Sequence, residues 1–595
     1  MPFYYNPLDK NTKSIIGAVS NKQNLILKVF TNNSYAKLIL KNDTKDTLTC
    51  YDMLAFDGGF SVTLSCLEVG LYYYYFESDN ISYYQNEEML AENKGGESFQ
   101  LLVYDSSYKV PNLKGGIIYQ IFPDRFYRKG KGFTLPSGKI KKKWGEEPDY
   151  LPNEKGKILN NDFYGGNFLG IIEKLDYLKS LGVTLIYLNP IGLAYSNHRY
   201  DTANYFEIDN LLGSIEDFKS LIEKAHAKGI KIMLDGVYNH TGDDSVYFNK
   251  YASFDGLGAY QSKRSKYYDW YNFKNYPDKY ECWWGIDVLP AINKNSKDFQ
   301  KYISGGNGVI SYYMGLGVDG FRLDVVDELT SNFVKSIRKA VKSVNSEGIV
   351  LGEVWEDATN KIAYDEKKEY FLGKELDSVM NYPLKDAIIN YVLYKDSKLL
   401  SKVIKTQINN YPKKSLDILM NLLGTHDTAR ILTVLTGVDT NISRFEAVNR
   451  KVDEKLLNIA RERLKKAVVL LYTLYGLPTI YYGDERGMEG FKDPFNRKCI
   501  DWNKNSSLIS FYKKLGEIRR SEKAFEDGEV EIVCDFSGAI IFKRKKDGEE
   551  IIVAVNLGEY NYVFKSENGL KNLFTKEIKN KFILEKDDWL ILKPQ

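Results

Sequence analysis

The middle of the chain alternates between short apolar strands and amphipathic helices, and this alternation limits the possible folds more than any other feature. In one helix, Ser214 and Asp217 form a capping pair at the start, and Gly229 is suited to the end. A second helix is expected over residues 331–345, where apolar residues recur on one face. The strands are expected to begin near residues 117, 183, 231, 319, 349, 377, 418 and 478. Eight successive strand–helix units predict an α/β fold, the (β/α)8 TIM barrel.

Three domains are predicted around this pattern. The barrel should occupy residues 113–523, which is long for this fold, so one connection must carry an inserted subdomain. Residues 241–305, after the third strand, are the candidate insertion. Residues 1–112 and 524–595 contain strands separated by turn-forming residues and show no helical pattern. We therefore expect an N-terminal and a C-terminal β-sandwich domain on either side of the barrel.

Composition limits the partners and the compartment. The 595-residue chain has a net charge of +3 and no basic face, so no nucleic-acid partner is predicted. No apolar stretch approaches the length of a membrane span, so no membrane association is predicted. The five cysteines are scattered and show neither a disulfide pattern nor metal-ligand spacing. These features predict a cytoplasmic protein with free thiols and no metal site.

Charged side chains occur where two neighbouring strands are expected to end. Arg322 and Asp324 are two residues apart, so they point to the same face of their strand. Glu353 ends the next strand along the chain. An arginine beside an aspartate favours the ionised form that a nucleophile needs, and a nearby glutamate can supply a proton. Such a pair of carboxylates is what the cleavage of a glycosidic bond requires.

Other predicted strand ends carry polar clusters as well. Three of the four histidines of the chain fall in these clusters, although one such histidine alone would more often be structural. Together they indicate one site, because the carboxyl ends of all barrel strands meet on one face. The clustered residues are His198 and Tyr200 after the second strand, Asp235 and His240 after the third, and His426 and Asp427 after the seventh.

These segments resemble the signature regions of the α-amylase family, in particular its neopullulanase, cyclomaltodextrinase and maltogenic amylase group. Residues 119–126, 289–293 and 482–497 add to the resemblance, which covers nearly the whole chain and includes an N-terminal domain similar to a starch-binding module. The resemblance implies a retaining glycoside hydrolase that cleaves α-1,4-glucosidic bonds in maltooligosaccharides, cyclodextrins, pullulan or starch fragments. Cleavage of α-1,6 bonds is left open.

The resemblance also implies roles for individual residues. Asp324 would attack the anomeric carbon, Glu353 would act as general acid and base, and Asp427 would bind sugar hydroxyls in the distorted transition state. For Asp235, a purely structural ion pair is an equally acceptable interpretation. The residues assigned to substrate binding are His198, Tyr200, Asp235, His240, Arg322, His426, Asp493 and Arg497.

The chain departs from the family pattern in two respects. Many members bind calcium through Asn and Asp after the first strand and an Asp after a Gly-Gly pair, but here residues 127–131 supply cations and Asn167 follows the glycines. We therefore predict no calcium at that place and no cofactor. On the side of the leaving sugar, Phe321, residues 326–327 and Glu356 differ from the usual residues, so substrate preference is uncertain.

Several alternatives stay open. The enzyme could transfer the glycosyl unit to a sugar instead of water, and a non-catalytic glucan-binding protein is a more remote alternative. The N-terminal domain could bind glucan, or it could pack on a partner barrel in a homodimer. Most of the many aromatic side chains over residues 267–284 are expected to form the core of the insertion, and one or two are expected to contact sugar.

Overall fold

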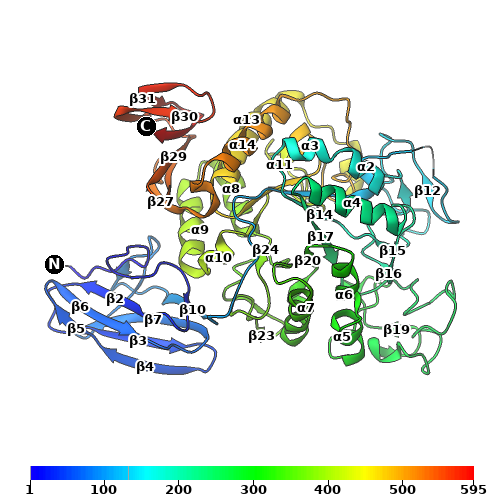
Figure 1. The fold of residues 1–595 in the computed structure, drawn as a ribbon, viewed down its shortest axis with the longest axis horizontal. Helices are drawn as coiled ribbons and strands as arrows, with labels where there is room; N and C mark the ends of the chain where they lie inside the picture. The colour runs from blue at the N-terminus through cyan, green and yellow to red at the C-terminus, as the bar shows by residue number, and fades with distance from the viewer. Residues whose placement is uncertain (1, 131–132) are drawn as a thin grey trace.

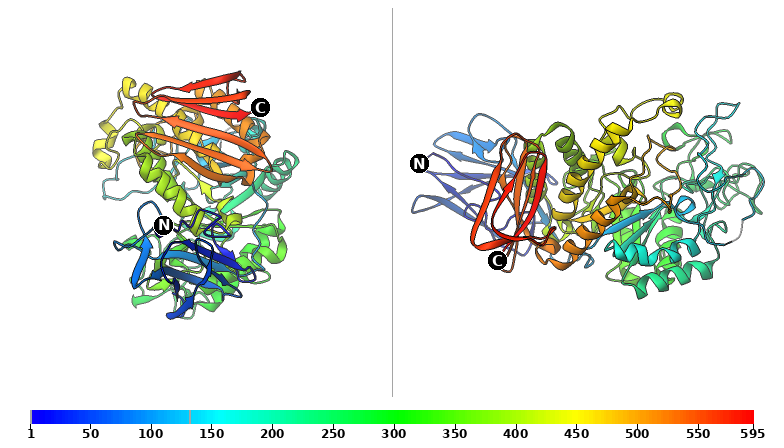
Figure 2. Two further views of the ribbon diagram at one scale, coloured as in Figure 1. Left: turned by 90° about the vertical axis from the view of Figure 1, so that its left-hand side faces the viewer. Right: turned by 90° about the horizontal axis from the view of Figure 1, so that it is seen from above.

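The computed structural model describes residues 2–130 and 133–595 and has three parts. A central barrel carries one β domain at the N-terminal end of the chain and another at the C-terminal end (Figure 1). Both β domains lie on the same side of the barrel, as the views in Figure 2 show. Long connections build the pocket described below, and one of them, residues 355–377, reaches the N-terminal domain.

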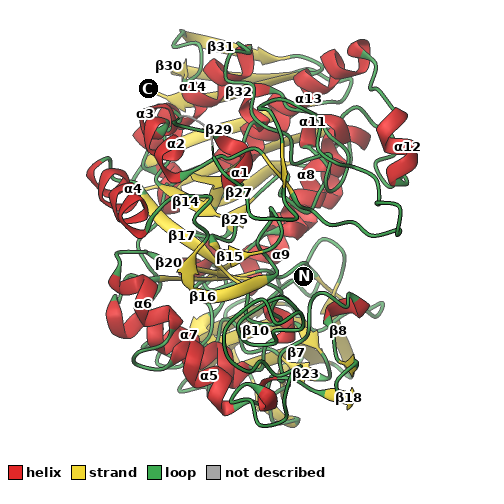
Figure 3. Cartoon of the chain, turned by 90° about the vertical axis from the view of Figure 1, so that its right-hand side faces the viewer, coloured by secondary structure: helices red, strands yellow, loops and turns green. Residues whose placement is uncertain are grey.

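The barrel contains all eight predicted strands in one parallel sheet. Their order is β24-β21-β20-β17-β14-β11-β26-β25, and a parallel bridge between Met380 and Met420 joins the two edges. Helices surround the strands (Figure 3), so the strand side chains are buried and the predicted (β/α)8 fold is confirmed. The strands are β11 (Ile118–Ile121), β14 (Leu185–Leu188), β17 (Lys231–Gly236), β20 (Gly320–Leu323), β21 (Ile349–Gly352), β24 (Ser378–Val379), β25 (Met420–Asn421) and β26 (Leu477–Tyr481).

The two helices described from the sequence are present. Helix α4 (Ile215–Ala227) begins with the predicted capping box between Ser214 and Asp217. Helix α7 (Ser331–Val344) begins after Thr330, whose side chain accepts a hydrogen bond from the Phe333 N–H. The other helices are α1 (Pro123–Phe126), α2 (Phe168–Glu173), α3 (Leu175–Ser180), α5 (Lys297–Ser304), α6 (Val309–Gly315), α8 (Tyr382–Tyr394), α9 (Ser397–Asn410), α10 (Lys413–Leu416), α11 (Ile431–Val434), α12 (Arg444–Asn449), α13 (Glu454–Thr473), α14 (Ser507–Ser521) and α15 (Ala524–Asp527).

The N-terminal domain is the expected sandwich. One sheet has the order β1-β10-β7-β3-β4, with β8 paired to β7 and β9 paired to β8, and a second sheet has the order β2-β6-β5. A separate apolar core lies between the two sheets. The strands are β1 (Val19–Ser20), β2 (Leu25–Phe30), β3 (Lys37–Asn42), β4 (Thr47–Asp52), β5 (Leu54–Phe56), β6 (Gly59–Leu64), β7 (Gly70–Ser78), β8 (Ile81–Gln85), β9 (Ala91–Glu92) and β10 (Phe99–Tyr104).

The C-terminal domain is a six-stranded antiparallel sheet with its own core. Arg544 on its second strand donates a hydrogen bond to the Thr473 carbonyl at the end of α13, which ties this sheet to the back of the barrel. The strands are β27 (Glu529–Cys534), β28 (Ala539–Lys546), β29 (Glu549–Asn556), β30 (Tyr562–Asn572), β31 (Ile578–Leu584) and β32 (Asp588–Pro594).

The long connection after β17 forms the predicted insertion. It contains the hairpin of β18 (Phe273–Asn275) and β19 (Lys279–Tyr280) and a cluster of packed aromatic rings that includes the buried Trp270 and Tyr271. Its last predicted residues belong instead to α5, which packs against α7 in the outer helical layer. Of the nine aromatic side chains in residues 267–284, Trp270 and Tyr271 are buried in the core, and Tyr267, Phe273 and Tyr280 are partly buried against it, so the expectation holds for five of them.

Candidate active site

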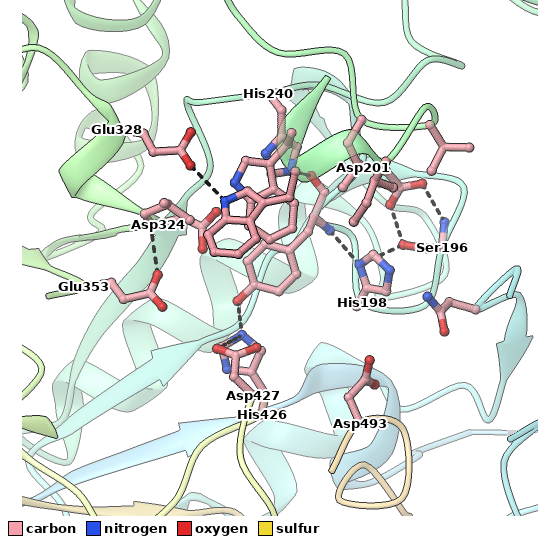
Figure 4. A pocket seen from close by; sticks show the side chains of 18 of the residues that line it. Ser196, His198, Asp201, His240, Asp324, Glu328, Glu353, His426, Asp427 and Asp493 are labelled. Atoms are coloured by element: carbon pink, nitrogen blue, oxygen red, sulfur yellow. Dashed lines mark hydrogen bonds and ion pairs between the residues drawn. The ribbon is translucent and has the colours of Figure 1, made fainter. Parts of the chain in front are cut away.

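A large pocket lies at the carboxyl ends of the barrel strands. Its volume is about 1270 Å³. It is lined by side chains from the connections that follow seven of the eight strands. Figure 4 shows Asp324 and Glu353 on one side of this pocket, His426 and Asp427 below, and Asp493 on the opposite side. The polar residues that the sequence placed at separate strand ends therefore meet around one hollow.

Arg322 lies beneath the floor of the pocket and bonds to three carboxylates. Its Nη1 donates to Asp235 Oδ1 at 2.7 Å and to Asp324 Oδ1 at 2.8 Å, and its Nη2 donates to Glu353 Oε2 at 2.6 Å. Strand register explains this convergence, because Asp235 is the direct cross-strand partner of Arg322 and Glu353 follows the strand on the other side. The side chain of Arg322 is fully buried.

The protonation of this cluster differs from the simple prediction. Burial raises the pKa of Asp324 well above its ordinary value, while Arg322 lowers it and Glu353 raises it further. Burial also raises the pKa of Asp235, and Arg322 opposes that rise. The sequence predicts Asp324 and Asp235 as partners of Arg322, but its single positive charge is also shared with Glu353. A proton retained within the cluster is therefore favoured.

The backbone after Asp324 helps to hold Glu353. Val325 has φ 42° and ψ 50°, a left-handed conformation that is unusual for a β-branched residue. In this conformation its N–H donates to Glu353 Oε2 at 2.9 Å, and the indole Nε1 of Trp355 donates to Oε1 at 3.1 Å. Backbone strain of this kind collects at functional sites, where the surrounding structure maintains it. The carboxyl group of Glu353 is thus fixed by contacts to both oxygens.

A neutral histidine and a tyrosine complete the floor. Gln120 Nε2 lies 2.9 Å from His426 Nδ1, which therefore accepts and leaves the proton on Nε2. Burial holds the pKa of His426 well below its usual value, so the ring is neutral. His426 Nε2 bonds to the Tyr200 hydroxyl, and that hydroxyl donates to Asp235 Oδ2 at 2.6 Å. Burial also lowers the pKa of His240, to about 4.

The far side of the pocket carries alternating charges. Arg497 Nη1 lies 2.8 Å from Asp493 Oδ1, and its Nη2 lies 3.7 Å from Asp427 Oδ1. Arg444 on α12 approaches Asp493 at 3.7 Å from the other direction. His198 accepts a hydrogen bond at Nδ1 from the Tyr200 N–H and faces the same cavity. These side chains offer paired donors and acceptors to sugar hydroxyls.

Most of the predicted site residues line the pocket, but two do not. Asp235 and Arg322 were assigned to substrate binding, and the structure places both beneath the lining, where they contact the carboxylates and tyrosines instead. Phe321 is likewise buried away from the pocket. The predicted residues on the lining are His198, Tyr200, His240, Asp324, Glu353, His426, Asp427, Asp493 and Arg497.

Other lining residues were not predicted. Lys361 and Tyr364 come from the connection after β21, Arg444 comes from α12, and residues 157–160 come from the connection after β11. They lie in polar segments that look like ordinary surface, so no local signal singles them out. In the insertion, Trp283 and Trp284 line the pocket, and the contact of one or two of these rings with sugar stays a prediction.

At the place where many family members bind calcium, the side chain of Asn167 is engaged in hydrogen bonds to the backbone. Asn167 Oδ1 accepts a hydrogen bond from the Gly170 N–H at the start of α2, and its Nδ2 donates to the Lys129 carbonyl. Lys131, part of the same prediction, lies outside the described residues. Within residues 2–130 and 133–595, no cluster of three or more His, Cys, Asp or Glu side chains has the arrangement of a metal site. No helix among these residues is long and apolar enough to span a membrane.

Comparisons with known proteins find a family and several relatives. The sequence model of the family described as the alpha amylase catalytic domain matches residues 120–523. An amylopullulanase of Thermoanaerobacter thermohydrosulfuricus is 36% identical over 91% of this chain, and the match covers 41% of that protein. A cyclomaltodextrinase of Thermoanaerobacter pseudethanolicus is 34% identical, with 74% of this chain and 70% of that protein covered. The chain thus spans less than half of the amylopullulanases it matches.

Comparison with solved structures finds proteins of the same fold. The solved type III pullulan hydrolase of Thermococcus kodakarensis has a TM-score of 0.70 and 25% sequence identity to this chain, and the match covers 99% of this chain and 100% of that one.

Proposed function

Since this chain belongs to the α-amylase family of glycoside hydrolases, we propose that it is a retaining enzyme that cleaves α-1,4-glucosidic bonds in maltooligosaccharides, cyclodextrins and fragments of pullulan or starch. The observation that carries the proposal is the convergence of Asp324 and Glu353 on one guanidinium at the floor of a sugar-sized pocket. The similarity to an amylopullulanase, a cyclomaltodextrinase and a pullulan hydrolase supports the substrate class.

The proposed mechanism gives a separate role to each of the two carboxyl groups. Asp324 attacks C1 of the sugar, and Glu353 transfers its proton to the departing glycosidic oxygen. The resulting covalent glycosyl intermediate is then cleaved by water, from which Glu353 takes back a proton. Two successive displacements at C1 retain its configuration.

The neighbouring groups stabilise the distorted sugar ring. Asp427 is at the pocket surface with its carboxylate held between His426 Nε2, at 3.2 Å, and Arg497, so it can accept hydrogen bonds from sugar hydroxyls. The neutral His426 and His240 rings can donate or accept without adding a positive charge next to an oxocarbenium-like centre. The aromatic face of Tyr200 forms part of the same lining.

Transfer to a sugar acceptor is a second candidate reaction, and one observation favours it. The rim on the side of Glu353 exposes large apolar groups, including Trp284, which is 78% exposed, and Tyr364. Such surfaces bind sugar rings in preference to bulk water, so an acceptor sugar could compete with water for the intermediate. Cleavage of α-1,6 bonds and a homodimer remain open alternatives, and a cytoplasmic location and the absence of calcium at the usual family site remain predictions.

The decisive experiment replaces Glu353 by Gln. Hydrolysis of maltotetraose should fall by at least about a thousandfold, because general acid catalysis is lost, while calorimetric binding of maltotetraose persists. The matched control is Glu223→Gln on the exposed face of α4, which should keep the wild-type rate. Nuclear magnetic resonance of the first product should show the α-anomer. A β-anomer as the first product would contradict the retaining mechanism, and wild-type rates in Glu353→Gln would remove the assignment of the acid.

A further inference from the structure

The segment after Glu353, residues 355–377, forms one wall of the pocket. It contains the hairpin of β22 (Ile362–Ala363) and β23 (Glu366–Lys367), and the pocket lining includes Trp355, Lys361 and Tyr364 from this segment. Trp355 bonds directly to Glu353, the proposed proton donor to the departing oxygen. On the basis of the proposed function, this wall therefore borders the sugar on the leaving side of the cleaved bond.

Lys361 presents a fixed ammonium group on this wall. Its Nζ lies 3.2 Å from Asp327 Oδ2 and also bonds to Glu356, and its side chain is 14% exposed. The Tyr370 hydroxyl holds the other oxygen of Asp327 at 2.6 Å. An ammonium group has three N–H donors, and the two carboxylates use two of them. One donor of Lys361 is left for a ligand in the pocket.

The surroundings of Lys361 favour its positively charged form. Although burial lowers the pKa of Lys361, the hydrogen bonds to Glu356 and Asp327 raise it above its ordinary value overall. Hydrogen bonds from a charged donor are stronger than those between neutral groups. A sugar hydroxyl facing Lys361 would therefore gain more than it would from a neutral side chain at the same place.

The N-terminal sandwich forms hydrogen bonds with the residues directly before Lys361. Gln100 on β10 donates from Nε2 to Thr359 Oγ1 at 2.7 Å and accepts at Oε1 from Asn360 Nδ2 at 2.9 Å. Gln100 is only 6% exposed, and its bond to Thr359 is buried, whereas the bond to Asn360 is partly buried. At the far end of the hairpin, Lys367 bonds to the Asp43 carbonyl of the same sandwich at 2.8 Å. The hairpin lies between this sandwich and α7 in Figure 1.

We propose that Lys361 is a specificity-determining residue that donates a hydrogen bond to the sugar on the leaving side of the cleaved bond, and that Gln100 is a positioning residue that keeps Lys361 in place. The N-terminal domain would then shape the pocket of its own chain through this contact. Substrates with a sugar as leaving group should benefit from Lys361, whereas substrates with a planar aromatic leaving group should not, because the latter offer no hydroxyl to the ammonium group.

The test compares two substrates that differ in the leaving group. The measured quantity is the ratio of kcat/KM for maltotetraose to kcat/KM for 4-nitrophenyl α-maltoside. In Lys361→Met this ratio should fall about tenfold, which corresponds to the loss of one hydrogen bond from a charged donor. Lys361→Arg keeps the charge and should retain most of the ratio. The matched control is Lys374→Met, an exposed lysine of the same segment that lies outside the pocket, and it should keep the wild-type ratio.

A second variant tests the positioning role. In Gln100→Leu the ratio should fall about threefold, through KM for maltotetraose and not through kcat, since only the alignment of the wall is disturbed. The control Glu88→Ala removes an exposed bond between the N-terminal domain and Lys398 on α9 and should leave the ratio unchanged. The melting temperature of each variant is measured to establish that the protein is folded.

The possible outcomes separate the two proposals. If the wild type cleaves both substrates and Lys361→Met keeps the wild-type ratio, the role of Lys361 is refuted and the proposed function stands. An equal loss on both substrates would also refute it, because it would indicate a structural role. If the wild type cleaves neither substrate, both proposals fail. A tenfold fall in Lys361→Met, with Gln100→Leu unchanged, would refute only the positioning role.

Discussion

Two charge networks of the same kind border the pocket, and they differ chiefly in burial. Beneath the floor, one fully buried arginine, Arg322, bonds to three carboxylates. In the wall, one lysine, Lys361, pairs with two carboxylates and remains partly exposed to the cavity. Each network joins segments that are distant in the sequence and places a cation within reach of several acids.

The difference shows how burial changes the effect of the same pairing. Away from water, charges interact strongly, and an unpaired one is severely penalised, so the Arg322 network controls protonation and geometry. Near water, a comparable pair contributes little to stability. The wall network is therefore free to exchange partners with a ligand. Three predictions, in order of decreasing effect on the free energy of unfolding, test this contrast.

The largest effect is expected for Arg322→Met. Removal of the guanidinium leaves Asp235, Asp324 and Glu353 buried without a cation, and the free energy of unfolding should fall by about 3–5 kcal/mol. Urea denaturation followed by tryptophan fluorescence measures this change. The control Arg264→Met removes an exposed arginine of the insertion and should change it by less than about 0.5 kcal/mol. Equal values for the two variants would contradict the contrast.

An intermediate effect is expected at Glu375, a fully buried carboxyl at the base of the wall. Its closest cation is Lys335 Nζ, 3.8 Å away, and burial raises its pKa to about 7. Because the folded pKa is raised, the folded state binds the proton more tightly than the unfolded chain. This contribution to stability is therefore present at acidic pH and is lost as the pH rises from about 4 to above 7, by roughly 3 kcal/mol.

The measurement is the free energy of unfolding of the wild type and Glu375→Gln at several pH values. The neutral amide does not titrate, so the variant should lose part of the decrease seen in the wild type. Asp484, whose pKa burial raises to about 7 as well, remains in both proteins and accounts for a residual slope. Parallel curves for the two proteins would show that Glu375 does not titrate in this range.

The smallest effect is expected for Lys361→Met. Because the ammonium group is partly exposed, its loss should change the free energy of unfolding by less than about 1 kcal/mol, although it should alter substrate preference. The same urea denaturation gives the value. A loss as large as that of Arg322→Met would mean that the wall network is a structural element and would remove the distinction between the two networks.

Much of the fold and part of the site could be predicted from local patterns. Periodicity and caps identified the barrel elements, as the capping box of Ser214 and Asp217 illustrates. The site could be predicted because a barrel collects its strand ends on one face, so Asp324, Glu353 and Asp427 needed only to be located at those ends. Their catalytic roles remain a prediction until the variants are measured.

The contacts between distant segments could not be predicted in this way. The bond from Gln100 to residues 359–360 spans 259 positions or more, and nothing near either end signals it. The sharing of Arg322 among carboxylates from three strands likewise depends on strand register, which brings Asp235 and Glu353 to the same guanidinium as Asp324.

The amino-acid sequence by itself determined the eight strand–helix units and the chemical groups that stand at their ends, because periodicity and strand alternation are local properties. Only the tertiary structure decided how many carboxylates share each cation, how deeply each group is withdrawn from water, and which part of the N-terminal domain supports the pocket. These outcomes depend on distances and solvent exposure, and both arise only when remote parts of the chain pack together.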